Sequence, residues 1–412
     1  MPRPQLILPV IVISQFFGTS LWFAGNGVMN DLVNTFHLEG NALGHLTSAV
    51  QLGFIAGTFV FAVLTIADRF SPSRIFLISA LAGALFNLGT ILENGSFMSL
   101  FFFRFATGFF LAGIYPVGMK IASDHYQQGL GKSLGFLVGA LVVGTALPHL
   151  LKGFTEHLPW RLVLVSTSSL AVLGGLLMFL LVPDGPHRRQ GQRPDLTAFF
   201  NVFKHREFRS SAFGYFGHMW ELYTFWAFVP VMLSLFVQLH PQTHFNVPIL
   251  SFSIIGLGGV ACVVGGYLSQ SLGTKRTAFI ALLASCICCL LSPLVFQAGF
   301  PALMIAFLIF WGMVVIADSP LFSTLVAQYA QPEFKGTALT IVTSLGFAIT
   351  IGSIQLTGFL LGKMNPVYVF MILAVGPVLG LMANQFTFSK SSAFILAIIS
   401  SAYFLAISTF AE

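Results

Sequence analysis

Charged side chains are scarce in this chain. Only 8% of its residues are Asp, Glu, Lys or Arg, whereas 56% are hydrophobic and the mean hydropathy is +0.88. Soluble domains carry about 25% charged residues, so this composition excludes a soluble globular protein. The net charge of +6 does not indicate a nucleic-acid partner, because the basic residues lie in loops between apolar runs and not on one polar face.

Cysteine is also rare, and the signatures of several enzyme classes are missing. The four cysteines lie in apolar runs with no histidine near them, so we expect buried thiols, with neither disulfides nor a metal site. No GxxxxGK(S/T) phosphate-binding loop occurs, which argues against ATP as the energy source, and no HExxH zinc pattern occurs. We therefore expect no enzymatic activity and no cofactor. The cysteines are Cys262, Cys286, Cys288 and Cys289.

The sequence has instead a series of apolar runs that are long enough to cross a bilayer. Backbone polar groups find no water in lipid, so these runs are expected to cross as helices. The first run is too long for a signal-peptide core and is interpreted as a retained helix. The twelve runs cover about residues 6–29, 42–67, 75–92, 97–122, 130–151, 161–182, 208–237, 248–271, 278–296, 301–328, 336–361 and 367–386.

Two landmarks predict that the chain consists of two related halves. Arg74, in the loop between the second and third runs, recurs as Arg276, 202 residues later. Tyr126 recurs as Tyr329, 203 residues later, and each tyrosine is followed six residues on by a lysine. Two repeats at nearly one offset indicate six helices in each half.

Lysine and arginine are distributed unevenly among the loops. If the N-terminus is cytoplasmic, fifteen of the 19 basic residues fall on the cytoplasmic side, while Arg104 lies within a span. An excess of basic residues is typical of cytoplasmic loops, so we predict this orientation. The three basic residues on the outer side are Lys152, Arg161 and Lys363.

Two segments outside the twelve runs have recognisable patterns. The polar interval 183–209 contains four apolar residues at the spacing of one helical face, beside basic residues, which predicts a short amphipathic helix on the membrane surface. A flexible linker is the alternative. The run 393–410 is just long enough to cross, and we expect a peripheral helix, either a thirteenth span or one in the interface. The four apolar residues are Leu196, Phe199, Phe200 and Phe203.

The loop between the second and third runs resembles a signature of the major facilitator superfamily, Gly-x3-Asp-Arg-x-Gly-Arg-Lys/Arg. Asp68 and Arg69 match it, and Arg74 supplies a later basic position. With the six-plus-six layout, this resemblance covers about residues 5–388 and implies a bacterial membrane transporter, without indicating a substrate. Departures from the signature are Leu64 and Ser71 at its glycines and Pro72 at its arginine. The second copy of the loop supplies Gly266, Gly273, Lys275 and Arg276.

The resemblance implies an all-α fold of two six-helix bundles related by a pseudo-two-fold axis. Residues 1–182 and 210–388 would form the bundles, 183–209 a cytoplasmic linker, and 389–412 a hydrophobic tail.

The resemblance also implies a conformational latch at the loop. Asp68 would bind the N-terminus of the eleventh helix, where the backbone carries partial positive charge. Arg74 would pair with Asp124, and Arg69, Lys275 and Arg276 complete the set. Such latches bias a conformational equilibrium. Alternatively, these charges only mark the topology.

Three ionisable residues lie inside predicted spans, where a charge is costly and suggests a function. Because an apolar environment favours the neutral form of a carboxyl group, Glu221 is our first candidate for proton coupling and Asp318 the second. His218 stands three residues before Glu221 on the same helix face, as in a proton relay, although a metal pair is an alternative. Arg104 resembles an intramembrane arginine of this family and is a candidate for binding an anionic group. A structural ion pair is the alternative.

The first and seventh helices line the central cavity in this family. On this resemblance, the substrate-cavity candidates are Arg104, Trp22, Asn26, Trp220, Tyr223 and Tyr115.

We therefore expect a monomeric secondary transporter of the bacterial inner membrane that moves a small organic solute by alternating access, coupled to protons. Its cavity should lie near the midplane between the halves. The alternatives are an uncoupled facilitator, a drug or metabolite efflux pump, and a membrane sensor that binds a ligand without transporting it.

Overall fold

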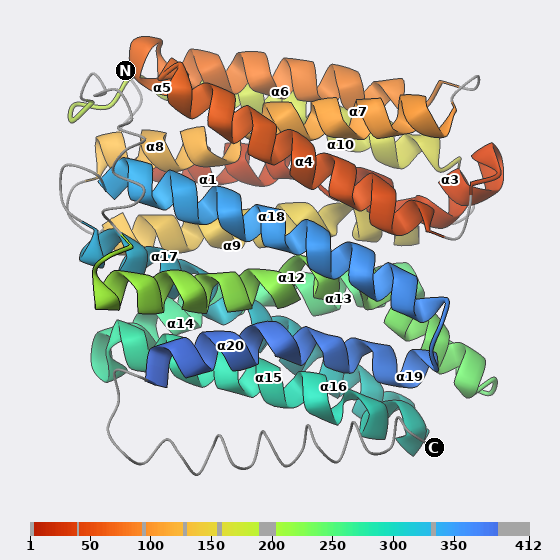
Figure 1. Ribbon diagram of the computed structural model, residues 1–412. Coiled ribbons are helices and arrows are strands. Elements are labelled where there is room, and N and C mark those ends of the chain that lie inside the picture. The colour runs from red at the N-terminus through yellow and green to blue at the C-terminus, as the bar shows by residue number, and fades with distance from the viewer. Residues whose placement is uncertain are drawn as a thin grey trace.

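The computed structural model describes residues 4–38, 41–92, 96–126, 130–154, 159–188, 203–330 and 335–385. Within these ranges every regular element is a helix, so the predicted all-α fold is confirmed. The predicted amphipathic helix near 196–203 and the tail at 393–410 lie outside the described residues, apart from Phe203. Figure 1 shows two stacked groups of nearly parallel helices, one from each half of the chain.

The N-terminal half forms the upper group in Figure 1. Its long helices follow the predicted runs to within a few residues, and several runs are divided into two or more helices. The helices are α1 (Pro4–Thr19), α2 (Ala24–Gly27), α3 (Met29–Phe36), α4 (Ala42–Val63), α5 (Ile66–Arg69), α6 (Pro72–Gly89), α7 (Phe97–Leu111), α8 (Tyr115–His125), α9 (Leu130–Phe154) and α10 (Arg161–Leu181).

The C-terminal half forms the lower group and repeats this plan. It consists of α12 (Arg206–Leu239), α13 (Val247–Gly256), α14 (Gly258–Leu272), α15 (Thr274–Ala298), α16 (Pro301–Ala317), α17 (Ser319–Tyr329), α18 (Lys335–Leu361), α19 (Pro366–Val369), the 3-10 helix η2 (Phe370–Ala374) and α20 (Val375–Gln385).

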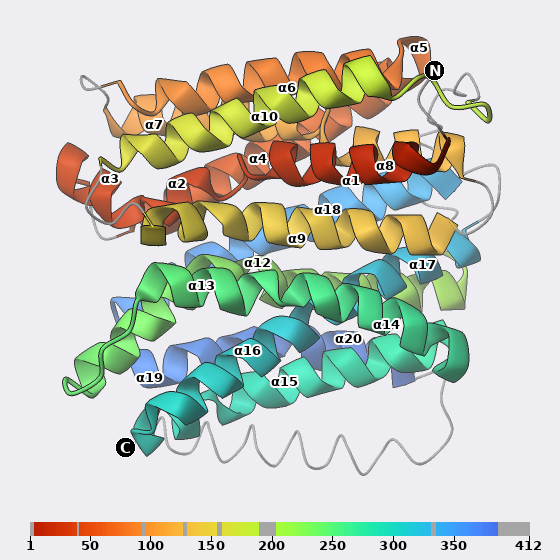
Figure 2. The same ribbon diagram turned by 180° about the vertical axis from the view of Figure 1, so that it is seen from behind.

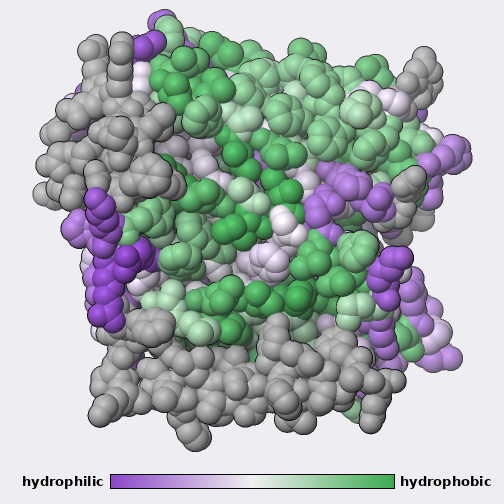
Figure 3. Space-filling model, viewed as in Figure 1, coloured by the Kyte–Doolittle hydropathy of each residue, from purple (hydrophilic) through white to green (hydrophobic). Residues whose placement is uncertain are grey.

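Eleven helical stretches in the described ranges are long and apolar enough to cross a membrane, as a multi-pass membrane protein requires. Figure 3 shows the corresponding surface, which is hydrophobic along the middle of the helices and hydrophilic towards both ends. Large apolar side chains such as Leu85, Leu180 and Leu294 are exposed on the outside of the bundles. In water such a surface would aggregate, whereas in lipid it is the expected exterior.

The first predicted run, 6–29, is not one helix, so that prediction is wrong in detail. α1 ends at Thr19 and α2 begins at Ala24, with i to i−3 hydrogen bonds in between, such as Trp22 N–H to the Thr19 carbonyl. The hydroxyl of Ser20 bonds to the Phe17 carbonyl. Local hydroxyls of this kind compete with the regular helical pattern.

The same internal break occurs in both halves. α7 and α8 are separated at residues 112–114, and α16 and α17 are separated at Asp318. The predicted uninterrupted runs 97–122 and 301–328 therefore each contain a discontinuity. Because Tyr115 and Ser319, which open α8 and α17, are 204 residues apart, the break belongs to the repeat itself.

The two halves meet on two sides of the molecule. In Figure 1, α4 and α18 lie side by side across the middle of the molecule. On the opposite side, seen in Figure 2, α9 packs against α13 and α14. Gly139 of α9 and Gly259 of α14 touch there, and a Cβ atom on Gly259 would lie 3.1 Å from the Gly139 carbonyl oxygen. Small residues allow this close approach of two membrane helices.

Candidate functional site

The middle of the molecule, where the halves meet, is filled by aromatic rings. Trp22 and Phe54 come from the N-terminal half, and Tyr223 and Phe347 from the C-terminal half; we call these four residues the central aromatic cluster. The Trp22 ring centroid lies 4.8 Å from that of Phe54, 5.7 Å from Tyr223 and 5.6 Å from Phe347. All four side chains are at most 2% exposed. The cluster therefore closes the centre of the junction in this conformation.

The predicted cavity residues divide into two groups around this cluster. Tyr115 lies 6.4 Å from Trp22, and Asn26 donates a 2.8 Å hydrogen bond to the Thr47 hydroxyl of α4. Trp220 points elsewhere, because its indole N–H bonds to the Ile372 carbonyl within the C-terminal half. The structure thus brings Trp22, Tyr115 and Tyr223 together, but not Trp220.

A cavity of about 630 Å³ opens between the halves, beside the start of α4 and the ends of α12 and α18. Gln355 of α18 donates a 2.9 Å hydrogen bond to the Ser48 hydroxyl of α4 near this end, so one polar contact joins the halves there. None of the residues that line the cavity is charged. They include Asn41, Gly44, Phe228, Ser234, Gln238 and Phe359.

Arg104 is buried in the N-terminal half, with its guanidinium turned towards the break after α1. It donates hydrogen bonds to the carbonyls of Leu21 at 3.3 Å and Trp22 at 2.5 Å, and to the Asn87 side chain at 3.4 Å. Its side chain is 1% exposed, and no carboxylate among the described residues pairs with it. The geometry makes Arg104 a charged donor to two backbone carbonyls in the break between α1 and α2.

His218 and Asp318 form a buried contact between α12 and the break that separates α16 from α17. The His218 Nδ1 atom lies 2.7 Å from the Asp318 Oδ1 atom, and neither side chain is more than 1% exposed. Residues 258 and 265 of α14 are glycines whose added Cβ atoms would crowd α16 near this break. A titratable pair therefore sits at a joint of the C-terminal bundle, screened from solvent.

Glu221 is fully buried one turn further along α12, but its surroundings differ. Its carboxylate accepts hydrogen bonds from the Trp311 indole at 2.6 Å, the Ser285 hydroxyl at 2.9 Å and the Cys289 thiol at 3.3 Å. Three donors from α15 and α16 satisfy the carboxylate without a cation, which is the geometry of a positioned carboxylate.

The structure describes the side chains of the predicted latch residues except that of Asp68. Arg69 and Arg74 are exposed. Asp124 contacts the Lys120 amine at 3.2 Å, and the expected Arg74–Asp124 pair does not occur among the ion pairs of the described residues. Lys275 lies 3.1 Å from Glu207 and joins α15 to α12, while Arg276 is exposed.

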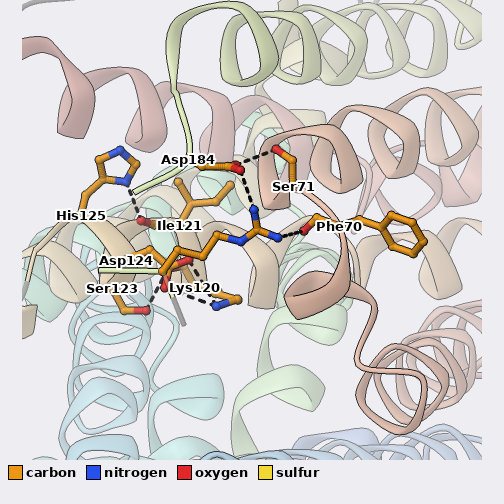
Figure 4. Close-up of polar contacts among 9 residues, drawn as sticks. Phe70, Ser71, Lys120, Ile121, Ser123, Asp124, His125 and Asp184 are labelled. Carbon is orange, nitrogen blue, oxygen red and sulfur yellow. Dashed lines mark hydrogen bonds and ion pairs between the residues drawn. The ribbon is translucent and has the colours of Figure 1, made fainter. Parts of the chain in front are cut away.

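The loop is instead tied to the segment that follows α10, as Figure 4 shows. Asp184 accepts a 2.7 Å hydrogen bond from the Ser71 hydroxyl and contacts Arg188 at 2.6 Å. Arg188 in turn donates to the Phe70 carbonyl at 2.8 Å. Ser71, which departs from the family signature, therefore makes one of these connections.

The structure also locates the cysteines and a GxSxG-like sequence. All four cysteines are free and buried, and no group of three metal-ligating side chains occurs within the described ranges. The sequence at 131–135 reads Gly-Lys-Ser-Leu-Gly and matches GxSxG in letters. It lies inside the continuous helix α9, without the strand-to-helix turn that a serine nucleophile of that type needs.

The fold and the buried polar groups define a two-bundle helical membrane protein. The sequence profile of the Major Facilitator Superfamily matches residues 11–353, and the chain belongs to this family. It is 25% identical to "Uncharacterized transporter YgaY" of Escherichia coli O157:H7 over 206 residues, 47% of this chain and 50% of that one. It is 23% identical over 190 residues to "Inner membrane transport protein YnfM" of Escherichia coli K12, covering 45% of this chain and 43% of that one. The chain thus spans about half the length of these relatives.

Solved structures support the fold. The human organic anion transporter MFSD10 superimposes with a TM-score of 0.73 at 14% identity, covering 93% of this chain and 100% of the other. A structure of the nucleoside transporter NupG gives 0.71 at 15% identity, covering 93% and 100%. A bacterial homologue of the lysosomal transporter Spinster, in an inward-facing, occupied conformation, gives 0.68 at 16% identity, covering 99% and 98%.

Proposed function

We propose that this chain is a proton-coupled secondary transporter that moves a small organic solute across the bacterial inner membrane by alternating access. Membership of the Major Facilitator Superfamily supports the class of function. The single observation that carries the coupling is the buried 2.7 Å contact between His218 and Asp318. A charge inside a membrane domain is costly, so titratable groups there are expected to have a function.

The His218–Asp318 pair is our proposed proton site. When one proton is shared, the pair is either an ion pair or two neutral groups, and its net charge is zero. A second proton, or the loss of the first, leaves a net charge in a site that has no solvent to stabilise it. The free energy of the contact between α12 and the break that separates α16 from α17 therefore depends on the protonation of this pair. A conformational change coupled to protons requires such a dependence.

Glu221, the first candidate from sequence, is proposed to support this site and not to carry the proton. Its three hydrogen bonds from Trp311, Ser285 and Cys289 hold the carboxyl group in place. Asp318 does not receive three hydrogen bonds in this way. Its Oδ2 atom lacks a hydrogen-bond partner among the described residues. That difference favours Asp318 as the group that gains and loses the proton.

Alternating access would be a movement of the two halves about the central aromatic cluster. With the N-terminus in the cytoplasm, the 630 Å³ cavity faces the outside. The Gln355–Ser48 hydrogen bond crosses the junction near that end and must break when the halves separate there. The Asp184–Arg188–Phe70 contacts lie within the N-terminal half, so they would move with it as one body.

The test is transport by the purified protein in liposomes. The liposomes are given an inward proton gradient and a defined mixture of sugars, amino acids, nucleosides and aromatic amides, and uptake is followed by mass spectrometry. Wild type should accumulate at least one component only while the gradient lasts. Asp318→Asn should lose accumulation but keep exchange of that component between the two sides, because only the coupling is removed.

Asp31→Asn is the matched control, because Asp31 forms an ion pair with Lys152 at 2.8 Å outside the bundle interior. It should accumulate the solute as wild type does. Equal uptake with and without the gradient would identify an uncoupled facilitator and refute proton coupling. Loss of accumulation in Glu221→Gln but not in Asp318→Asn would return the proton site to Glu221. Ligand binding without any flux would identify a sensor.

A further inference from the structure

A second set of buried polar groups lies at the junction of the halves, and none of them is charged. Gln51 of α4 is fully buried, and both atoms of its amide lack a hydrogen-bond partner among the described residues. The indole N–H groups of Trp22 and Trp226 are buried and unpaired as well. Leaving such a buried group unsatisfied lowers the stability of this state. These groups therefore favour a state in which something else bonds to them.

The neighbours of Gln51 show which face of α4 it occupies. Thr47 and Ser48, one turn earlier, receive hydrogen bonds from Asn26 of α2 and Gln355 of α18, respectively. Residues three and four apart share one face of a helix. Gln51 therefore faces the space between α2 and α18, at the junction of the two halves.

The next turn of α4 leads to the same place. Phe54, three residues after Gln51, packs against Trp22 at 4.8 Å and against Phe347 at 4.5 Å between ring centroids. The opposite face of α4 is committed to α7, because a Cβ atom on Gly53 would overlap the Phe105 carbonyl. Gln51 thus lies between the polar contacts near the cavity and the central aromatic cluster.

Among the described residues, the three charged side chains buried within the helical spans have hydrogen-bond or ion-pair partners other than Gln51. Arg104 donates to backbone carbonyls and Asn87, Asp318 contacts His218, and Glu221 accepts three hydrogen bonds inside the C-terminal half. The cavity beyond Gln51 has no charged lining residue. An ion placed here would lose its hydration without gaining a counter-charge, which costs far more than burying a neutral polar molecule.

We propose that Gln51, with the indole N–H groups of Trp22 and Trp226, forms a binding site for an uncharged, planar organic solute. The solute would carry a hydrogen-bond acceptor for the indoles, and a donor and acceptor for the Gln51 amide. Its ring would stack between the aromatic side chains that the two halves contribute to the central aromatic cluster. This proposal rests on the proposed transport function and adds the chemical class of the substrate.

The test uses three probes of the same shape and different charge: 2-naphthamide, 2-naphthoate and 2-naphthamidine. Their equilibrium binding to the purified full chain in lipid nanodiscs is measured by calorimetry. Wild type should bind the neutral 2-naphthamide at least about tenfold more tightly than either ion. Gln51→Leu should weaken 2-naphthamide binding by about tenfold, the effect of one lost hydrogen bond. Gln51→Glu, which keeps the size of the side chain, should shift the preference towards the cation 2-naphthamidine.

Gln15→Leu is the matched control. Gln15 is also fully buried with both amide atoms unpaired, but its Oε1 atom lies against Gly118 inside the N-terminal half. This variant should bind 2-naphthamide as wild type does. An unchanged affinity in Gln51→Leu, the same affinity for all three probes, or no detectable binding of 2-naphthamide would overturn the proposal. Preferential binding of 2-naphthoate would do so too and would point to Arg104.

Failure of this proposal and failure of the proposed function give different results. The probe experiment measures binding at equilibrium and needs neither flux nor a proton gradient. Proton-driven accumulation with no preference among the probes would leave the transporter intact and remove the Gln51 site. Gln51-dependent binding in a protein that moves no solute would keep the site and overturn the transport function.

Discussion

Removing His218 should destabilise the protein strongly, because it leaves Asp318 buried without its partner. The two side chains touch at 2.7 Å and are at most 1% exposed. Unit charges about 4 Å apart attract by about 4 kcal/mol at an effective dielectric constant of about 20. Breaking a buried pair by removing one partner costs about 3–5 kcal/mol. His218→Gln should therefore lower the free energy of unfolding by about 3 kcal/mol or more, whereas the loss in Asp318→Asn should be smaller, because the remaining imidazole can be neutral.

A double-mutant cycle measures the interaction itself. The four proteins are unfolded with SDS from detergent micelles while tryptophan fluorescence is followed, and the coupling energy is calculated from the four unfolding free energies. We expect about 2–4 kcal/mol for His218 with Asp318. The control cycle uses Lys152 and Asp31, which lie at a similar 2.8 Å but are 18% and 27% exposed. That pair should couple by at most about 1 kcal/mol. A coupling below about 0.5 kcal/mol at His218 and Asp318 would refute the buried ion pair.

Three further predictions follow from packing and hydrogen bonding. Gly53→Ala should lower the free energy of unfolding by about 1–3 kcal/mol in the same SDS assay, because the added Cβ atom would overlap the Phe105 carbonyl. Gly266→Ala is the control and should not lower it, because the space around Gly266 is open. Arg104→Met should lose about 3 kcal/mol or more, since two carbonyls of the break after α1 and Asn87 lose a charged donor; stability within 1 kcal/mol of wild type would contradict this role. Asp184→Asn should change stability by less than about 1 kcal/mol, because Asp184 and Arg188 are partly exposed.

The membrane fold could be predicted from the sequence because apolar runs and loop charges report directly on the bilayer. The runs were long, and Arg74 and Arg276 marked the repeat. The breaks at residues 20–23 and at Asp318 could not be predicted. They depend on which carbonyls find a distant donor, such as Arg104, and single-sequence periodicity carries no information on such tertiary contacts.

The candidate site shows the same division. Ionisable residues in an apolar run stand out in a sequence, so Glu221, Asp318 and Arg104 could be recognised. Their partners could not, because His218 is joined to Asp318 and Trp311 to Glu221 only by the packing of separate helices. Gln51 was missed, since an uncharged amide in a helix gives no signal until its burial and lack of partners are seen.

Reversible cross-linking of the two halves tests alternating access most directly. Gly153, near the end of α9, and Ile249 of α13 belong to different halves, and a Cβ atom on Gly153 would lie 3.4 Å from the Ile249 backbone nitrogen. Cysteines at both positions are within reach of a disulfide, which requires Cβ atoms about 3.5–4.5 Å apart. The four native cysteines are buried.

The measurement is uptake by the Gly153→Cys/Ile249→Cys protein in liposomes, before and after reduction with dithiothreitol. The oxidised protein should lose uptake of the solute that wild type accumulates, and reduction should restore it. Each single-cysteine variant should transport under both conditions. Full uptake by the cross-linked protein would contradict a mechanism in which the halves separate at this end.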